Sequence, residues 1–473
     1  MLFVKVASET NLIILPETVK RSLKMQEKIT LDLSYCLAEK GFSLDELIFR
    51  LSELFKKKAF SEILKLILAS CQDALLWRIF NGKMISVCCC GKCDFTLNGG
   101  YNRTLKTSLG EVKMFWHRLK CKHCENSLTL LKEFMQLKNY QSKSNELEKI
   151  IVDAVSETTY RRGVQSISDH GLIDIPHRTA HDWVMRTDCD EIELSGDIIG
   201  SMGPVQVFPD GTKFKGIPKN GQAVKGDLKT IVGVTTNGDV FPLGSYTNES
   251  WENINKMWKE KKIKFPDGSI VICDGEPGLA EAFVDQVEDL QRCHWHIGHD
   301  LYHSMWQDGA TSKEVKPLRT ALCGALAIEL PECDFKQVSE AEKDKLEERM
   351  ERTEDAIDEL IRYLHEKGYK VAGNYIFNAK KSMFSYIKRW LKYGLICPRA
   401  SSLIERVTRE LARRLKRMAY NWSDKGAGKI ARIILKKFIN KKEWELYWKK
   451  KMNIIGNVYF SIGNYKLSQN FAH

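Results

Sequence analysis

Two aspartate residues close apolar, β-rich runs of the sequence, and each is followed by glycine. Asp210 lies at the end of VQVFPDG and Asp274 at the end of SIVICDG, with a separation of 274 − 210 = 64 residues. Carboxylates at the tips of neighbouring strands can together hold two Mg²⁺ or Mn²⁺ ions about 4 Å apart, since these ions prefer hard oxygen ligands. In phosphoryl transfer one ion activates the attacking water or hydroxyl group, and the other stabilises the leaving oxygen. We therefore expect Asp210 and Asp274 to be catalytic metal ligands at two strand tips.

The same two aspartates have a purely structural interpretation. Asp-Gly is a common turn dipeptide, and FPDG recurs at 265–268, where the pattern indicates only a turn. Taken singly, each aspartate is as well explained by a turn. Their shared position at the ends of apolar strands, in a suitable order of elements, favours the metal site.

A third acidic ligand is predicted in the helical run SSLIERVTRELARRLKRMA at 401–419. At 100° per residue, Glu405 lies at the edge of the apolar stripe of this helix, where it can lean over the strand tips. The alternative is that Ser402 and Glu405 form an S-x-x-E capping box, a structural role that does not exclude metal binding. We expect Glu405 to complete the Mg²⁺ site.

Two pairs of cysteines have the spacing of zinc ligands. The pairs are C-x2-C motifs separated by 121 − 93 − 1 = 27 residues, namely Cys90, Cys93, Cys121 and Cys124. Four thiolates close a tetrahedral structural Zn²⁺ site, and the long gap predicts an extended hairpin that turns near Gly110. Cys88, Cys89 and His123 compete as ligands, and incidental cysteines are the alternative.

The order of the elements predicts a multidomain α+β fold. Residues 204–275 follow the order β-β-β-α-β, which fits the first half of a ribonuclease-H-like α/β domain, where the first and fourth strands are neighbours. Helical patterns follow at 311–395 and 401–419, and helices are also expected over 30–80. The predicted boundaries are 1–83 for an N-terminal helical region, 84–130 for a zinc ribbon, 145–190 for a small helix-turn-helix-like domain, 200–300 for the first part of the catalytic domain, 301–395 for an all-helical insertion, 396–440 for the last catalytic helices and 441–473 for a basic aromatic tail.

The segment 145–188 has the pattern of three short helices, with Gly171 and Pro176 at the last junction. This is compatible with a helix-turn-helix whose last helix presents Arg178 and His181 to DNA. A helical linker with a solvated polar face is the alternative.

Composition agrees with a nucleic-acid partner without requiring one. The chain has 473 residues and a formal net charge of +12, and its basic tail carries ten Lys or Arg against two Glu between 425 and 451. This stretch, 425–451, contains Lys436 and Lys437. Its pattern predicts either a phosphate-binding surface or a solvated amphipathic helix. No run approaches the roughly 20 apolar residues of a membrane helix, and the cysteine usage is typical of a reducing compartment. These features predict a cytoplasmic protein that does not bind membranes.

The motifs VFPDGT, ICDGEPGL, CHWH and SSLIERVTRELARR, together with RTLKTSLGEV, resemble the Mutator-like DDE transposases of prokaryotic insertion sequences over residues 85–440. The cysteine ribbon indicates a divergent subgroup. The resemblance implies metal-dependent cleavage at transposon ends by water, then attack of the freed 3′-hydroxyl on target DNA, and a dimer or larger assembly on paired ends. It also implies that the Cys-x2-His of Cys293 and His296 is a structural and DNA-contacting feature near the active site, a pair that by itself is half a zinc site.

The positive residues near the predicted third acid are interpreted in the same way. We expect Arg409, near Glu405, and Arg413, on the opposite side of the same helix, to contact DNA, and we expect the same of Lys436 and Lys437 farther along the chain. Two other functions remain open: a ribonuclease-H-like nuclease that cuts but does not join strands, and a domesticated zinc-ribbon DNA-binding protein.

Overall fold

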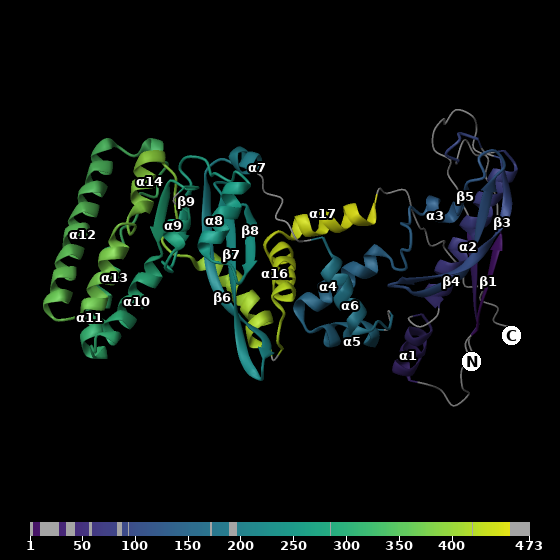
Figure 1. Ribbon diagram of the computed structural model, residues 1–473, viewed down its shortest axis with the longest axis horizontal. Coiled ribbons are helices and arrows are strands. Elements are labelled where there is room, and N and C mark those ends of the chain that lie inside the picture. Colours follow the sequence, from purple (N-terminus) through teal and green to yellow (C-terminus); the bar gives the residue numbers. More distant parts are fainter. Residues whose placement is uncertain are drawn as a thin grey trace, which may run out of the picture. The chain divides into compact units, whose positions relative to one another are not determined.

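The computed structural model describes residues 3–9, 28–34, 43–55, 59–82, 88–92, 94–170, 173–188, 196–283, 285–418 and 420–454. The chain forms two compact units (Figure 1). Unit 1 consists of Met1–Val184 with Trp448–His473, and unit 2 consists of Met185–Tyr447. Among the described residues, no helix is long and apolar enough to span a membrane. The seven predicted domain boundaries remain predictions, because this division is coarser.

Unit 1 combines short sheets with helices. Its elements are β1 (Phe3–Glu9), β2 (Lys28–Ser34), α1 (Leu44–Leu54), α2 (Phe60–Phe80), β3 (Phe95–Thr107), β4 (Gly110–Cys121), β5 (Ser127–Leu128), α3 (Leu130–Phe134), α4 (Asn145–Glu157), α5 (Tyr160–Asp169) and α6 (His177–Arg186). The prediction of helix from residue 30 is wrong, because Lys28–Ser34 pairs with β1 in an antiparallel ladder. Apolar and polar residues alternate strictly in KITLDLS, which is the period of a strand.

The core of unit 1 forms where α2 packs on the β3–β4 hairpin. Trp116 of β4 has no exposed surface and lies in a cluster with Leu75 and Ile79 of α2. The hairpin turns just before Gly110, whose φ of 112° lies in the region that glycine adopts without strain. The long hairpin and its turn were both predicted from the sequence. The predicted helical triplet is confirmed as α4, α5 and α6, with Ser144 and Thr159 capping the first two.

Unit 2 is built around one mixed sheet. Its elements are α7 (Gly196–Ser201), β6 (Val205–Lys219), β7 (Gln222–Thr235), β8 (Val240–Thr247), α8 (Trp251–Glu260), β9 (Ile270–Cys273), α9 (Leu279–Phe283), β10 (Asp289–Arg292), α10 (His294–Gln307), α11 (Ser312–Leu326), the 3-10 helix η2 (Phe335–Gln337), α12 (Glu340–Glu366), α13 (Lys370–Lys380), α14 (Ser385–Tyr393), α15 (Ser402–Ala412), the π-helix η3 (Arg413–Arg417), α16 (Asp424–Ile439) and α17 (Lys441–Met452), whose last residues belong to unit 1.

The strand order in this sheet is β10-β9-β6-β7-β8. The pairs β6–β7 and β7–β8 are antiparallel, whereas β6–β9 and β9–β10 are parallel. The first four strands and α8 match the predicted order, and the first and fourth strands are neighbours as expected. The edge strand β10 was not predicted, since DLQR is too short and too polar to show a strand period.

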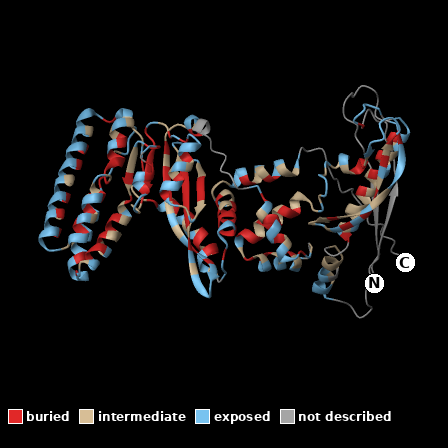
Figure 2. Cartoon of the chain, in the orientation of Figure 1, coloured by how far each residue is buried: buried red, intermediate tan, exposed pale blue. Residues whose placement is uncertain are grey.

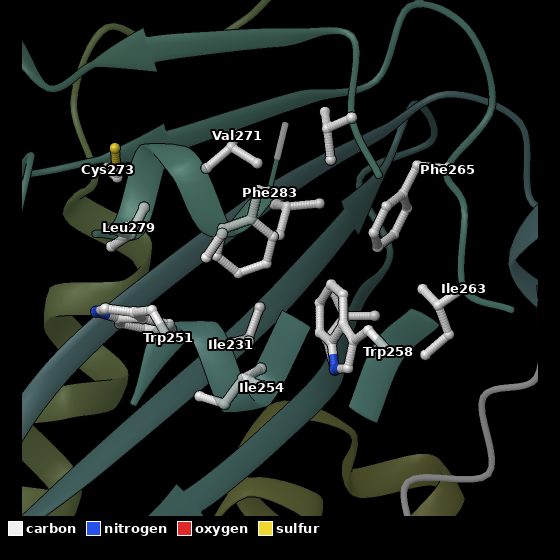
Figure 3. Close-up of a cluster of buried hydrophobic side chains, with 14 of the residues drawn as sticks. Ile231, Trp251, Ile254, Trp258, Ile263, Phe265, Val271, Cys273, Leu279 and Phe283 are labelled. Carbon is white, nitrogen blue, oxygen red and sulfur yellow. The ribbon is translucent and has the colours of Figure 1, made fainter. Parts of the chain in front are cut away.

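One face of the sheet carries the main hydrophobic core of unit 2. Val205, Val207 and Ile231 from the strands pack against Trp251 and Trp258 of α8 and against the residues of α9 (Figure 3). Figure 2 shows the middle of this sheet as buried, whereas the far end of the β6–β7 hairpin is exposed. Helix α15 packs on β6 and contacts α16, which packs on β8. The buried face of α15 includes Ile404 and Val407, as the apolar stripe predicts.

The segment after β10 is helical, as predicted for the insertion. Helix α10 packs on α11 and α13, α12 packs on α13, and α14 returns to β10 (Figure 1). The helix predicted over 401–419 instead changes to a π-helix at Arg413. In the tail, Trp444 and Trp448 are buried. Their burial favours the amphipathic interpretation of the tail over one in which its aromatic rings face DNA.

Truncation of one of the largest core side chains of unit 2 provides a test of this packing. Trp258 is 1% exposed and donates a hydrogen bond from Nε1 to the Tyr246 hydroxyl at 2.8 Å. We predict that Trp258→Ala destabilises unit 2 by about 3–5 kcal/mol, since a large cavity replaces the indole. Trp306, which is 68% exposed on α10, is the matched control, and Trp306→Ala should change stability by less than about 0.5 kcal/mol. Urea denaturation of the full chain followed by circular dichroism measures both, and equal effects would contradict the core assignment.

Candidate active site

The parallel register of β6 and β9 brings the two predicted aspartates to the same level of the sheet. Gln206 pairs with Ile270 and Val207 with Val271. Asp210 stands 210 − 207 = 3 residues after one member of this register, and Asp274 stands 274 − 271 = 3 residues after the other. Because side chains alternate along a strand, both carboxylates lie on the face opposite the α8–α9 core, which Val207 and Val271 join.

Asp210 does not lie at a strand tip, so this part of the prediction is wrong. It is an interior residue of β6 and pairs with Thr230 of β7. The strand continues past the Asp-Gly pair because the long β6–β7 hairpin keeps both residues in its ladder. Asp274, in contrast, directly follows the last residue of β9, as predicted. The Glu276 N–H donates to Asp274 Oδ1 at 2.9 Å and orients that carboxylate.

Asp210 is half-buried and its charge is poorly compensated. Burial raises the pKa of Asp210 to about 6, against the hydrogen bond from Thr408, and the negative charge of Asp274 raises it further. The Thr408 hydroxyl donates to Asp210 Oδ2 at 2.5 Å, and the Gly211 N–H donates to Oδ1 at 2.8 Å. Two carboxylates that repel each other in a partly buried place form a site that a divalent cation would stabilise.

Helix α15 carries Glu405 toward these aspartates. Glu405 precedes Thr408 by three residues, so the two side chains share one face of the helix. The predicted capping box of Ser402 and Glu405 is wrong, because α15 begins at Ser402 and its N-cap is Ser401. The Ser401 hydroxyl lies 3.4 Å from Glu405 Oε1 and 3.4 Å from Cys293 Sγ, so its single hydrogen can be donated to either group. The purely structural explanation of Glu405 as a reciprocal cap is thereby removed.

The Cys-x2-His motif lies beside Glu405. Ligand atoms of Cys293, His296 and Glu405 all lie within 4.8 Å of one another. Cys293 is the N-cap of α10, and its Sγ accepts hydrogen bonds from the N–H and the hydroxyl of Ser401, each at 3.4 Å. Burial acts to raise the pKa of the Cys293 thiol, but His296 and Ser401 lower it overall. Burial acts to lower the pKa of His296, but the contact with Cys293 and the negative charge of Asp274 raise it overall, so Asp274 is within electrostatic range of the imidazole.

Three further residues of the site were not found from the sequence. Thr408 and Ser401 are of types common in helices and helix caps, so their presence alone does not indicate a site. The three-residue spacing from Glu405 to Thr408, which puts both on one helix face, could have identified Thr408. Arg292 is the third, and its guanidinium lies where a Cβ on Gly275 would be, at 0.8 Å from Nη1. Gly275 has a φ of +87°, so glycine is required here both by the backbone and by the space. Arg292 therefore places a positive charge against Gly275, the residue that follows Asp274.

A cluster of four cysteines in unit 1 has the composition of a zinc site. The ligand atoms within 4.8 Å of one another belong to Cys88, Cys90, Cys121 and Cys124. Three of these were predicted, whereas the predicted Cys93 lies outside the described residues. Cys88, which the sequence suggested only as a competitor, takes the fourth position among the described residues.

The geometry of this cluster fits a tetrahedral ion. The Sγ–Sγ distances are 3.3 Å for Cys88 and Cys124 and 3.7 Å for Cys90 and Cys121, near the roughly 3.8 Å expected around Zn²⁺. Backbone N–H groups of Cys124 and His123 lower the pKa of the Cys121 thiol to about 6, which favours the thiolate form that binds metals. The cluster can therefore hold Zn²⁺.

The predicted DNA-contacting residues have mixed surroundings. Arg178 and His181 are exposed on α6, and Arg409 is exposed on α15. Arg413 forms an ion pair with Glu410 at 2.9 Å, so part of its charge is used within the helix. Lys436 and Lys437 at the end of α16 are half-buried. Contact of any of these residues with DNA remains a prediction.

Substitution of single cysteines tests the ligand set. We predict that Cys88→Ser and Cys121→Ser each lower the zinc content by about one ion per chain and destabilise unit 1, because a structural zinc site contributes folding energy. Cys89→Ser is the matched control and should leave the zinc content unchanged. Cys93→Ser decides the fourth ligand. If Cys93→Ser removes the ion and Cys88→Ser does not, the ligand is Cys93.

The raised pKa of Asp210 predicts how stability depends on pH in metal-free protein. An aspartate with a pKa of about 6 in the folded state and 3.8 as its ordinary value binds its proton more tightly when folded. Folded stability is then greatest below pH 4 and falls as the pH rises toward 6. In EDTA, we therefore expect the difference in free energy of unfolding between Asp210→Asn and the wild type to depend on pH. Between pH 4 and pH 7 this difference should shift in favour of the variant by about 1–2 kcal/mol. Denaturation at the two pH values measures this, with Asp267→Asn in the other Pro-Asp-Gly triplet as control; an equal change in both variants would refute it.

Comparisons with known proteins provide little beyond this geometry. No protein-family model matches the chain, and no curated protein matches it. Among solved structures it is similar to one described as "Drosophila P element transposase strand transfer complex", with 14% sequence identity, coverage of 67% of this chain and 85% of that chain, and a TM-score of 0.23. At this identity and TM-score the similarity carries no argument about activity, so functional inference depends on the residues of the site.

Proposed function

We propose that this chain is a DDE transposase, a polynucleotidyl transferase that cuts transposon ends and joins them to target DNA. The proposal is supported mainly by the parallel register of β6 and β9, in which Asp210 and Asp274 stand at the same level of the sheet. Helix α15 contacts this level, because Thr408 donates a hydrogen bond to Asp210. Glu405 precedes Thr408 by one turn of α15, and this spacing supports its assignment as the third acid. Three acids from two adjacent strands and one later helix form the set of oxygen donors that such chemistry requires.

The donor set fits two Mg²⁺ or Mn²⁺ ions. Asp210, Asp274 and Glu405 supply hard oxygen atoms, and the raised pKa of Asp210 marks negative charge that lacks a full partner. Bound ions would supply activation of the attacking oxygen and stabilisation of the leaving oxygen. Thr408 and the Glu276 N–H would orient the two aspartates, and Arg292 would attract a DNA phosphate to the edge of the site.

The finer assignment is to a divergent Mutator-like group of prokaryotic insertion sequences. It is supported by the CHWH and SSLIERVTRELARR motifs and by the strand order with neighbouring first and fourth strands, which fits a ribonuclease-H-like domain. Helices α10 to α14 would be the insertion. The cysteine cluster would hold a structural Zn²⁺, and α4, α5 and α6 would form a helix-turn-helix that binds transposon-end DNA. We further propose action in the cytoplasm as a dimer or larger assembly on paired ends.

The role of the aspartates is tested by substitution in the full chain. The substrate is a linear duplex made of the DNA that flanks this reading frame on both sides, incubated with Mg²⁺. We predict that Asp210→Asn and Asp274→Asn each reduce strand cleavage at least about 100-fold while duplex binding is retained, because ligand loss removes the metal chemistry. Asp267→Asn, at the exposed aspartate of the Pro-Asp-Gly triplet of 266–268, is the matched control and should cleave normally. Cleavage that survives both site substitutions would overturn the proposal.

Joining distinguishes the transposase from a nuclease. With a supercoiled plasmid as target, the transposase should join cleaved 3′-hydroxyl ends to the plasmid, and the joined product is measured by its altered migration. Metal-dependent cleavage with no joined product would instead identify a nuclease. Duplex binding without cleavage would identify a DNA-binding protein.

A further inference from the structure

The three side chains Cys293, His296 and Glu405 form a mixed sulfur, nitrogen and oxygen cluster that the transposase reaction does not require. Magnesium binds oxygen ligands and has little affinity for a thiol, so a cysteine beside Glu405 contributes nothing to a Mg²⁺ site. A thiolate, an imidazole and a carboxylate are instead the ligands that Zn²⁺ accepts. The sequence shows only half of this set, because Glu405 follows His296 by more than a hundred residues.

The cluster is held together by two helix starts. Cys293 caps α10 and Ser401 caps α15, and Ser401 donates both its N–H and its hydroxyl to Cys293 Sγ. A second backbone hydrogen bond, from the His294 N–H to the Arg399 carbonyl at 2.8 Å, joins the same two segments. Donors to a ligand sulfur are the usual outer contacts of a metal site, since they orient the ligand and stabilise its negative charge.

An unpaired atom points to a missing ligand at this place. Nδ1 of His296 is buried and has no hydrogen-bond partner among the described residues. A buried ring nitrogen without a partner is costly unless something else binds it. The ligand atoms of all three side chains lie within 4.8 Å of one another, so they are close enough to share one zinc ion.

We propose that Cys293, His296 and Glu405 form a binding site for a thiophilic divalent cation of the Zn²⁺ class, separate from the cysteine cluster of unit 1. Glu405 cannot be a ligand of this ion and of a Mg²⁺ ion at Asp210 and Asp274 at the same time. Occupation of the Cys293–His296–Glu405 site therefore inhibits Mg²⁺ binding at the aspartates. This inhibition rests on the proposed function, whereas the existence of the site does not. Three protein ligands leave a fourth position open to water.

Counting zinc ions in the full chain tests the site without any measurement of activity. After zinc is added and excess removed, native mass spectrometry should find two ions in the wild type, one in the cysteine cluster and one here. Cys293→Ser and His296→Gln should each retain one ion. Cys333→Ser, which changes an exposed cysteine of the same unit, should retain two. A single ion in the wild type, or two ions in both site variants, overturns the proposal, and the use of two variants covers a failure of one to fold.

The competition for Glu405 is tested with Mn²⁺ as the probe for the aspartate site. Electron paramagnetic resonance should show Mn²⁺ binding that Asp210→Asn abolishes, and zinc should weaken it about tenfold or more in the wild type but not in Cys293→Ser. Equal weakening in both proteins overturns the competition. A chain that binds two zinc ions but never cleaves DNA would remove the proposed function and leave this site standing.

Discussion

The parallel pairing of β6 with β9 is the constraint on which the candidate site depends. Through β6 the sheet changes from antiparallel to parallel, and the two strands are paired through Gln206–Ile270 and Val207–Val271. A shift of one residue in either strand would turn its aspartate toward the α8–α9 core. A carboxylate buried there without a partner would cost several kcal/mol. Val207 and Val271 are buried in that core, and their burial sets the register of the two strands. This register in turn determines that Asp210 and Asp274 lie on the opposite face.

Helix α15 depends on the same sheet and connects it to the helices that follow. Its apolar face packs on β6, Thr408 binds Asp210, and its N-cap binds Cys293 at the start of α10. One helix thus contacts both the aspartates and the Cys-x2-His segment. Since its place is set by burial along its length and by specific hydrogen bonds at two points, Glu405 is held by a rigid element and not by a loop.

In unit 1 the candidate metal ligands are the four clustered cysteines and not carboxylates. The four cysteines gather where β4 ends, at the border of the core that α2 covers: Cys88 and Cys121 are buried in this core, whereas Cys90 and Cys124 are exposed. Thiols gathered in this way repel one another as thiolates, so the arrangement is stable mainly with a bound ion. A bound ion would therefore add to the hydrophobic stabilisation of unit 1, whereas in unit 2 the carboxylates are placed by a large core.

The sequence by itself determined the elements whose periodicity is local. The helices α4, α5, α6, α8 and α12, the long hairpin, and the runs that become β6 to β9 follow from apolar spacing and turn residues, and the chemistry of aspartate and cysteine identified most candidate ligands. The sequence did not predict the short, polar strand β10. It also did not predict the strand Lys28–Ser34, although polar and apolar residues alternate there as they do in a strand. Only the tertiary structure decided that Asp210 lies inside a strand, that Ser401 and not Ser402 caps α15, and that Glu405 stands beside Cys293. These facts depend on pairing between residues distant in the chain, where burial and register, and not local propensity, select the conformation.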